Sequence, residues 1–274
     1  MKAFGPLAVA VVAALGAPAP ARAMTYSCAH RQSFGSDGCD PVCDASHLFY
    51  SDNQIDLFSS AMRSAGHTRV HRFADDNVWE SDWRDDADGY DDDYYVDNAE
   101  VYAYSSHGNR TYVNGQQQYM TPMCWGTEEG ACNVTSADIH FGELSGPHAV
   151  PSPGSLRFLL LATCYSVHTR PNEQWGANLA EGLEMVFGYQ FTSMDTLLTE
   201  DVLADFAEEA FIAHNRLKAT WMWAAEDFWV NDIPAVITAD ETGIKARERL
   251  RQMRATAPRR NETAPVRAWT WHQG

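Results

Sequence analysis

The stretch RFLLLAT, residues 157–163, is apolar at every position from Phe158 to Ala162. A strand with one face in water alternates apolar and polar residues, whereas a strand covered on both faces is a continuous apolar run. The stretch therefore predicts a strand buried in the middle of a parallel sheet, with layers of structure on both sides.

Strand and helix patterns alternate along the rest of the chain. Further short strands are predicted at 47–51, 68–73, 101–106, 189–193 and 235–239. Helices are predicted at 53–65, 174–187, 200–215, 218–229 and 241–254, and 109–154 is expected to be a long polar excursion. Strands separated by helices indicate an α/β fold with a mainly parallel central sheet and helices on both faces.

The N-terminus has the pattern of a secretory signal peptide. Lys2 precedes an apolar stretch that ends near Leu15, and Ala21-Arg22-Ala23 provides small residues around a cleavage site. We therefore expect residues 1–23 to be removed and the protein to be secreted or periplasmic. No later stretch is long and apolar enough to predict insertion into a membrane.

The mature chain is expected to comprise one domain with short flanking segments. These are a Cys-containing N-terminal segment at 24–46, an α/β domain at 47–240, and a basic C-terminal helix and tail at 241–274. The formal net charge of the whole chain is −17, and the signal peptide carries only basic charges. Such a negative field repels nucleic acids and anionic lipids, so neither is an expected partner.

Six cysteines in an exported chain predict disulfides. Cys124 and Cys132 lie eight residues apart in a Gly-containing loop and form the predicted pair. One pair within Cys28, Cys39 and Cys43 leaves a single N-terminal cysteine and Cys164 over. Two alternatives stay open: those two are bonded to each other, or Cys164 is a free thiol.

Two predicted strands end in residues that carry chemistry. VYAYSS, 101–106, runs into His107-Gly108, and the apolar strand at 157–163 runs into Cys164. Active groups collect at the carboxyl ends of parallel strands, so imidazole and thiol meet if the two strands are neighbours. The imidazole would deprotonate the nucleophilic thiol, and the backbone N–H groups of Gly108 and Cys164 would stabilise an oxyanion.

VYAYSSHG (101–108) followed by FLLLATC (158–164) resembles the caspase, legumain and gingipain group of cysteine peptidases. The chain is also similar to a group of secreted bacterial proteins through YVDNA and SHG (95–108), ATC (162–164) and WG…GLEMVFGY (175–189). The peptidase resemblance implies a caspase-like three-layer sandwich, His107 and Cys164 as a dyad, Gly108 at the oxyanion site, and peptide or protein substrates. These peptidases often have a glycine soon after the cysteine, where this chain has Tyr165-Ser166.

The competing hypothesis is an exported binding or structural module without catalysis. In that case His107 is a structural histidine at a strand end, and Cys164 is a buried thiol or a disulfide partner. The function predicted from the sequence is nevertheless a cysteine peptidase-like hydrolase that acts through a thioester.

No cofactor is predicted, with calcium as the one alternative. The acidic stretch 75–100 does not fit the EF-hand loop, because Arg84 and Tyr95 would occupy positions that require acids. A looser calcium site would use Asp91, Asp92 and Asp93, whereas the simpler interpretation is a solvated loop. The histidines lack zinc-site spacing.

A cluster of aromatic residues near the C-terminus has two interpretations. Its members are Trp221, Trp223, Phe228 and Trp229, with Trp269 and Trp271 further on. Trp221 lies seven and eight residues before Phe228 and Trp229, which is a helical spacing that favours a place in the core. The alternative is a flat platform for a carbohydrate or a peptide.

Overall fold

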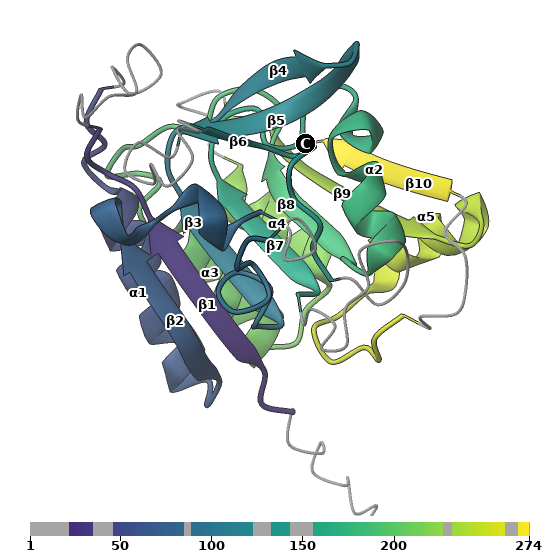
Figure 1. Ribbon diagram of the computed structural model, residues 1–274. Helices are drawn as coiled ribbons and strands as arrows, with labels where there is room; N and C mark the ends of the chain where they lie inside the picture. Colours follow the sequence, from purple (N-terminus) through teal and green to yellow (C-terminus); the bar gives the residue numbers. More distant parts are fainter. Residues whose placement is uncertain are drawn as a thin grey trace, which may run out of the picture.

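The computed structural model describes residues 22–34, 46–84, 89–122, 133–142, 156–226, 232–260 and 268–273. Its centre is a seven-stranded sheet in the order β10-β9-β8-β7-β3-β1-β2 (Figure 1). The strands are β1 (Thr25–His30), β2 (Thr68–Ala74), β3 (Val101–Ser105), β7 (Phe158–Ala162), β8 (Met185–Tyr189), β9 (Pro234–Asp240) and β10 (Ala268–Gln273).

The sheet is mainly parallel, as the apolar pattern predicts. Strands β2, β1, β3, β7 and β8 run parallel to one another. At one side of the sheet, β9 is antiparallel to β8, and β10 is antiparallel to β9. β7 lies in the middle of the sheet, and all five of its residues are buried. A continuous apolar run is therefore the expected composition for this strand.

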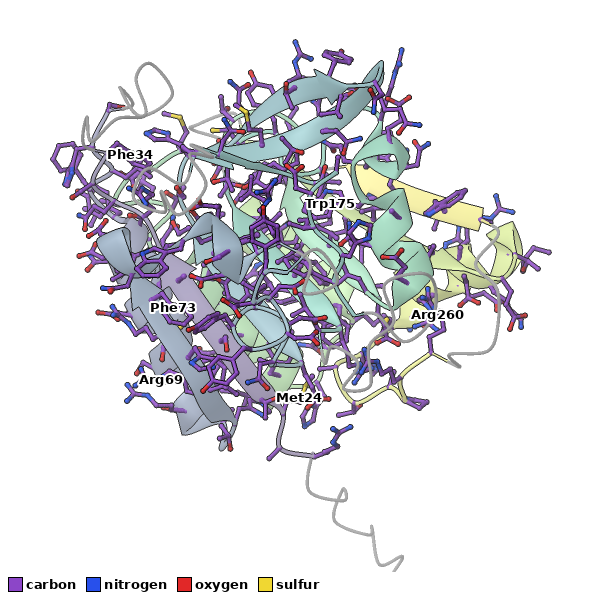
Figure 2. All side chains as sticks on the ribbon, viewed as in Figure 1. Met24, Phe34, Arg69, Phe73, Trp175 and Arg260 are labelled. Atoms are coloured by element: carbon purple, nitrogen blue, oxygen red, sulfur yellow. The ribbon has the colours of Figure 1, made fainter. Side chains whose placement is uncertain are left out.

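Helices cover both faces of the sheet and complete a three-layer α/β sandwich. One face packs against α1 (Ser51–Ser64), α3 (Val202–Ala207), α4 (Leu217–Ala225) and α5 (Gly243–Gln252). The other face packs against α2 (Pro171–Glu181), whose buried Trp175 is labelled in Figure 2. Each face has its own hydrophobic cluster, since successive strand residues such as Leu159 and Leu160 point to opposite sides. The α/β fold class is thus confirmed.

A second, smaller sheet lies beyond the carboxyl end of β3. It is antiparallel and contains β4 (Asn109–Val113), β5 (Gln116–Pro122) and β6 (Asn133–Thr135) (Figure 1). Asn114 and Gly115 have positive φ angles of 51° and 80°, which a two-residue hairpin turn between β4 and β5 requires. The sequence analysis expected only a polar excursion here. The structure shows instead a hairpin that begins two residues after His107.

Both flanking segments contribute strands to the main sheet. The sequence analysis placed 24–46 and 241–274 outside the α/β domain, whereas β1 pairs with β2 and β3 and β10 pairs with β9. Cys28 in β1 is fully buried and is a free cysteine. Cys28 therefore packs in the core as a small apolar side chain, which is typical of a free cysteine.

Two of the predicted strands were wrong. Residues 47–50 form an irregular approach to α1, which begins at Ser51. The strand predicted at 189–193 lies instead at Met185–Tyr189, as β8, and shares only Tyr189 with the prediction. The predicted helix 174–187 correspondingly ends at Glu181. Met185, Val186 and Phe187 are apolar in succession, so they satisfy a helical face and a doubly buried strand equally well, and periodicity cannot separate the two. Among the described helices, none has the length and apolarity needed to cross a bilayer.

Candidate functional site

The register of β3 and β7 brings His107 and Cys164 to the same edge of the sheet. The two strands are parallel neighbours, and their last residues, Ser105 and Ala162, are paired. His107 and Cys164 each follow two residues after this pair. The edge is formed by the carboxyl ends of the strands, where open α/β sheets hold their active groups.

Both side chains line one cavity of about 180 Å³. Its walls come from the ends of β3 and β7, from the approach to α1 and from the segment that follows β8. The lining residues are Leu48, Gln54, Ser105, Ser106, His107, Ala162, Cys164, Thr192, Ser193, Met194 and Asp195. Residues from four separate parts of the chain therefore enclose the thiol and the imidazole.

The Cys164 thiol is free and is held by backbone groups of Ser193. Its Sγ accepts a hydrogen bond from Ser193 N at 3.2 Å and donates to Ser193 O at 3.5 Å. Burial raises the pKa of Cys164, and the Asp232 carboxylate adds to the increase, while the backbone N–H groups of Ser193, Cys164 and Gly108 oppose it. The net direction is upward, so the resting group is a thiol rather than a thiolate.

His107 is oriented by a backbone carbonyl. Its Nε2 lies 2.8 Å from the carbonyl oxygen of Ser46, and its ring packs against Phe34 at a centroid distance of 4.7 Å. A carbonyl only accepts hydrogen bonds, so Nε2 carries the proton and the neutral ring has its lone pair on Nδ1. Thr121 Oγ1 also donates to the His107 carbonyl at 2.9 Å.

The sequence analysis could not find the group that orients His107, because Ser46 acts through its main chain and lies 61 residues away. In this structure His107 Nε2 is hydrogen-bonded to Ser46 and Cys164 Sγ to Ser193. The described residues show no hydrogen bond between the His107 and Cys164 side chains. Catalytic hydrogen bonds are often long in the absence of substrate and form when it binds.

Gly108 lies directly against the backbone of Cys164. A Cβ atom at this position would be 2.3 Å from the Cys164 carbonyl oxygen and 3.0 Å from its nitrogen. Only glycine permits this approach, which brings the Gly108 N–H close enough to Sγ to favour its negative charge. The three residues predicted from the strand ends, His107, Gly108 and Cys164, are thus gathered at one place.

The chain matches one family model over residues 35–249, and the description of that family is "Domain of unknown function (DUF6345)". The chain belongs to this family. The match includes His107, Gly108 and Cys164, and the description names no activity. No curated protein and no solved structure matches the chain.

The residue after the nucleophile candidate adopts a conformation typical of glycine. Tyr165 has a φ angle of 55°, in the left-handed region that costs roughly 1–2 kcal/mol for a residue with a side chain. Its N–H donates to the carbonyl of Phe191. A residue with a side chain therefore occupies a backbone conformation that favours glycine, and strain of this kind is concentrated at functional sites.

An arginine that the sequence analysis did not single out contacts Tyr165, the residue that follows Cys164. Arg110 donates from Nη1 to Nε2 of His168 at 2.6 Å, and its guanidinium lies 5.6 Å from the centre of the Tyr165 ring. His168 in turn donates a hydrogen bond from Nδ1 to the carbonyl oxygen of Gln190. Burial lowers the pKa of His168, and nearby Arg110 lowers it further, so the ring stays neutral and accepts from Arg110.

The candidate calcium ligands have different environments. Asp91 is exposed, Asp92 is fully buried and Asp93 is half-buried in the turns after Gly89. In the described ranges, no group of three or more His, Cys, Asp or Glu side chains is arranged to hold a metal ion. The predicted disulfide between Cys124 and Cys132 lies outside the described residues, as do Cys39 and Cys43.

Within the acidic stretch, Asp82 has an environment that changes its protonation. It ends the short 3-10 helix η2 (Glu80–Asp82), is buried and accepts a hydrogen bond from Trp79 N at 3.0 Å. Burial raises the pKa of Asp82 from 3.8 to about 7; Trp79 N–H opposes this increase, and the neighbouring Asp91 and Glu80 add to it.

This environment predicts a stability that depends on pH. Between pH 3.8 and about 7 the folded chain keeps a proton on Asp82 that the unfolded chain has lost. The free energy of unfolding should therefore fall as the pH rises through this window, by up to about 1.4 kcal/mol per pH unit from this group, and level off above it. Asp82→Asn, which stays neutral and can still accept from Trp79 N, should show a shallower decline in urea titrations at several pH values. The exposed Asp201→Asn serves as control, and equal slopes for Asp82→Asn and wild type would contradict the prediction.

Proposed function

We propose that the protein is an exported cysteine peptidase-like hydrolase with a caspase-like fold, and that it cleaves peptide or related acyl bonds through a thioester. The observation that carries the proposal is the register of β3 and β7, which brings His107 and the free Cys164 into one cavity at the carboxyl edge of a mainly parallel sheet, with Gly108 against the backbone of Cys164. This combination of a nucleophile, a base and close backbone N–H groups is the minimum for acyl transfer.

The proposed reaction begins with a thiol that must be deprotonated during attack. Because the pKa of Cys164 is raised, His107 would take the thiol proton on Nδ1 as Sγ attacks the carbonyl carbon. The Ser46 carbonyl holds Nε2–H and stabilises the imidazolium that results. This assigns His107 as general base and Ser46 as the group that positions it.

The rest of the cycle follows from the same groups. The N–H groups of Gly108 and Cys164 would stabilise the oxyanion, and His107 would return its proton to the leaving amine to leave a thioester. Water, deprotonated by His107, would then hydrolyse the thioester and regenerate the thiol. The first product carries the new amine and the second the new carboxylate.

The test is alkylation of the purified, unreduced mature protein by iodoacetamide at pH 7, with each labelled cysteine identified by peptide mass spectrometry. Cys28 serves as an internal control, because it is fully buried and burial raises its pKa to about 12. We expect Cys164 to be labelled in the folded protein and Cys28 only after denaturation. His107→Ala should slow the labelling of Cys164 by about 100-fold, the lower end of the range for loss of a general base.

A catalytic Cys164 also requires hydrolysis that Cys164→Ala abolishes, measured on a library of quenched fluorescent peptides. If Cys164 is found in a disulfide, or if its labelling is unchanged in His107→Ala, the hydrolase proposal fails. The alternative that then remains is a binding module in which the same cavity holds a ligand without reacting with it.

A further inference from the structure

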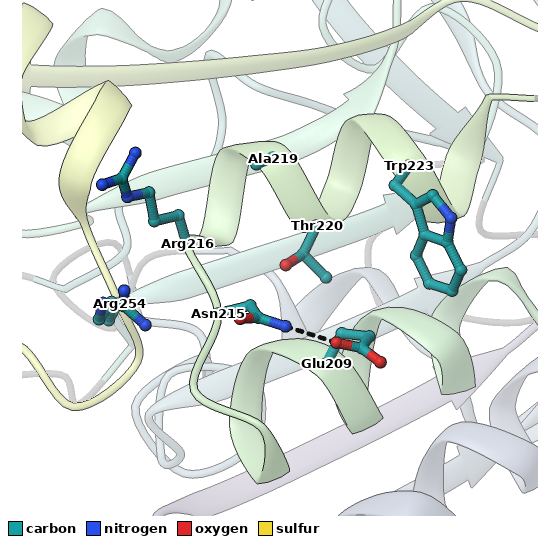
Figure 3. Close-up of a pocket in the computed structure, with 7 residues that line it drawn as sticks. All are labelled: Glu209, Asn215, Arg216, Ala219, Thr220, Trp223 and Arg254. Atoms are coloured by element: carbon teal, nitrogen blue, oxygen red, sulfur yellow. Dashed lines mark hydrogen bonds between the residues drawn. The ribbon is translucent and has the colours of Figure 1, made fainter.

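A second cavity, of about 480 Å³, lies on the helical face of the molecule and shares no residue with the cavity at Cys164 (Figure 3). It is formed where α4 begins, where the π-helical turn η4 (Glu208–Ile212) ends and where the chain leaves α5. Its lining residues are Glu209, Asn215, Arg216, Ala219, Thr220, Trp223 and Arg254. A volume of this size falls within the range of small-molecule binding sites.

The aromatic wall of this cavity is a tryptophan that the core does not use. Trp221 and Trp223 lie two residues apart on α4, so a helix points them in different directions. Trp221 is fully buried and donates from Nε1 to the Gly188 carbonyl, whereas Trp223 is 61% exposed. The core interpretation of the aromatic cluster thus holds for Trp221, and Trp223 presents its ring to the cavity.

The opposite end of the cavity is positively charged. Figure 3 shows Arg216 and Arg254 on the side away from Trp223. Arg254 is oriented by a hydrogen bond from Nη1 to the carbonyl of His214. Within the part of the chain that the structure describes, the exposed Arg216 side chain has no hydrogen bond or ion pair. Two arginines at one cavity stand out in a chain with a formal net charge of −17 and indicate an anionic ligand group.

Between the two ends lies a polar floor that offers both donors and acceptors. Asn215 Nδ2 donates to Glu209 Oε2 at 2.5 Å, which leaves the other carboxylate oxygen, the Asn215 amide oxygen and the Thr220 hydroxyl toward the cavity (Figure 3). A carboxylate here repels a second anionic group but accepts hydrogen bonds from hydroxyls. A ligand that suits this cavity would therefore carry its negative charge at the arginine end and neutral hydroxyl groups over Glu209.

We propose that this cavity binds an acidic carbohydrate, with a sugar carboxylate between Arg216 and Arg254, sugar hydroxyls on Glu209 and Asn215, and the apolar face of a neighbouring sugar ring on Trp223. Flat aromatic faces suit the C–H groups of a pyranose, and guanidinium groups bind carboxylates in two-pronged fashion. The site would hold the protein on acidic polysaccharide while the cavity at Cys164 remains open. It is independent of the proposed hydrolase activity.

The test is isothermal titration of the mature protein at low salt with a tetrasaccharide of alternating glucuronic acid and N-acetylglucosamine. A tetramer of N-acetylglucosamine is the neutral comparison. We expect the acidic sugar to bind at least about tenfold more tightly, and each of Arg216→Ala, Arg254→Ala and Trp223→Ala to weaken binding by about tenfold, which corresponds to about 1.4 kcal/mol. Added salt should weaken binding of the acidic sugar, since the arginines are exposed.

Matched controls separate this site from general effects. Arg251→Ala removes an exposed charge from the last turn of α5, and Trp269→Ala removes an exposed tryptophan from β10; both should bind like wild type. Circular dichroism verifies the fold of each variant. Absence of binding, equal affinity for the neutral sugar, or wild-type affinity in Trp223→Ala and Arg216→Ala would overturn the proposal. So would tighter binding of a short acidic peptide than of the acidic sugar.

Discussion

Gly108→Ala is expected to lower the free energy of unfolding by about 3 kcal/mol, the upper part of the usual range for overpacking, and to remove the His107-dependent part of Cys164 alkylation. The added methyl group would lie 2.3 Å from the Cys164 carbonyl oxygen and 3.0 Å from its nitrogen. Both are backbone atoms at the end of the central strand β7, so they cannot turn aside as a flexible side chain would. The end of β3 or of β7 must shift, and that shift separates the imidazole from the thiol.

The measurements are urea unfolding and the rate of Cys164 alkylation, each compared with Gly243→Ala. Gly243 is the first residue of α5, and a methyl group there would approach nothing more closely than 4.0 Å. Alanine also has the higher helix propensity, so this control should be neutral or slightly stabilising. Gly108→Ala with wild-type stability and wild-type alkylation would show that the backbone at the site is not packed as described.

Glu184→Ala is expected to cost about 3–5 kcal/mol of unfolding free energy, the usual effect of removing one partner from a buried ion pair. Glu184 is fully buried before β8, and its Oε2 lies 2.7 Å from Nη2 of Arg157, which is 3% exposed. Its Oε1 accepts from the backbone N–H of Arg260 at 2.5 Å and from Nη1 of Arg249 at 3.3 Å. Without this carboxylate, the Arg157 guanidinium keeps its charge and loses its main counter-charge.

The comparison for this variant is an ion pair at the surface. Glu241→Ala breaks the pair between Glu241 and Lys245, whose side chains are 36% and 51% exposed. Exposed pairs contribute about 0–1 kcal/mol, so urea unfolding of Glu241→Ala should resemble that of wild type. A loss below about 1 kcal/mol in Glu184→Ala would mean that water or other groups replace the carboxylate, contrary to the arrangement of Arg157, Arg249 and Arg260 around it.

The elements that could be predicted from the sequence are those whose residue pattern fits only one type of secondary structure. α1 was predicted at 53–65 and spans Ser51–Ser64, because its apolar residues recur at helical spacing on one face. β2, β3, β7 and β9 were predicted within one or two residues, since short apolar or β-branched runs between turn signals favour strands. At 189–193 the error arose because the spacing of the preceding apolar residues fits a helix and a strand equally well. At 47–51 it arose because Phe49 gave the segment an apolar pattern typical of a strand, although its side chain is exposed.

Three facts about the candidate site followed from the sequence alone: a doubly buried central strand, a mainly parallel sheet, and an imidazole and a thiol at two strand ends. Each is a local property, because side-chain pattern determines which faces of a strand are buried and where the strand stops. Only the tertiary structure decided that β3 and β7 are neighbours in register, and that Ser46 and Ser193 face His107 and Cys164. These last contacts are made by backbone groups that every residue carries, so the identity of the residue holds no signal for them.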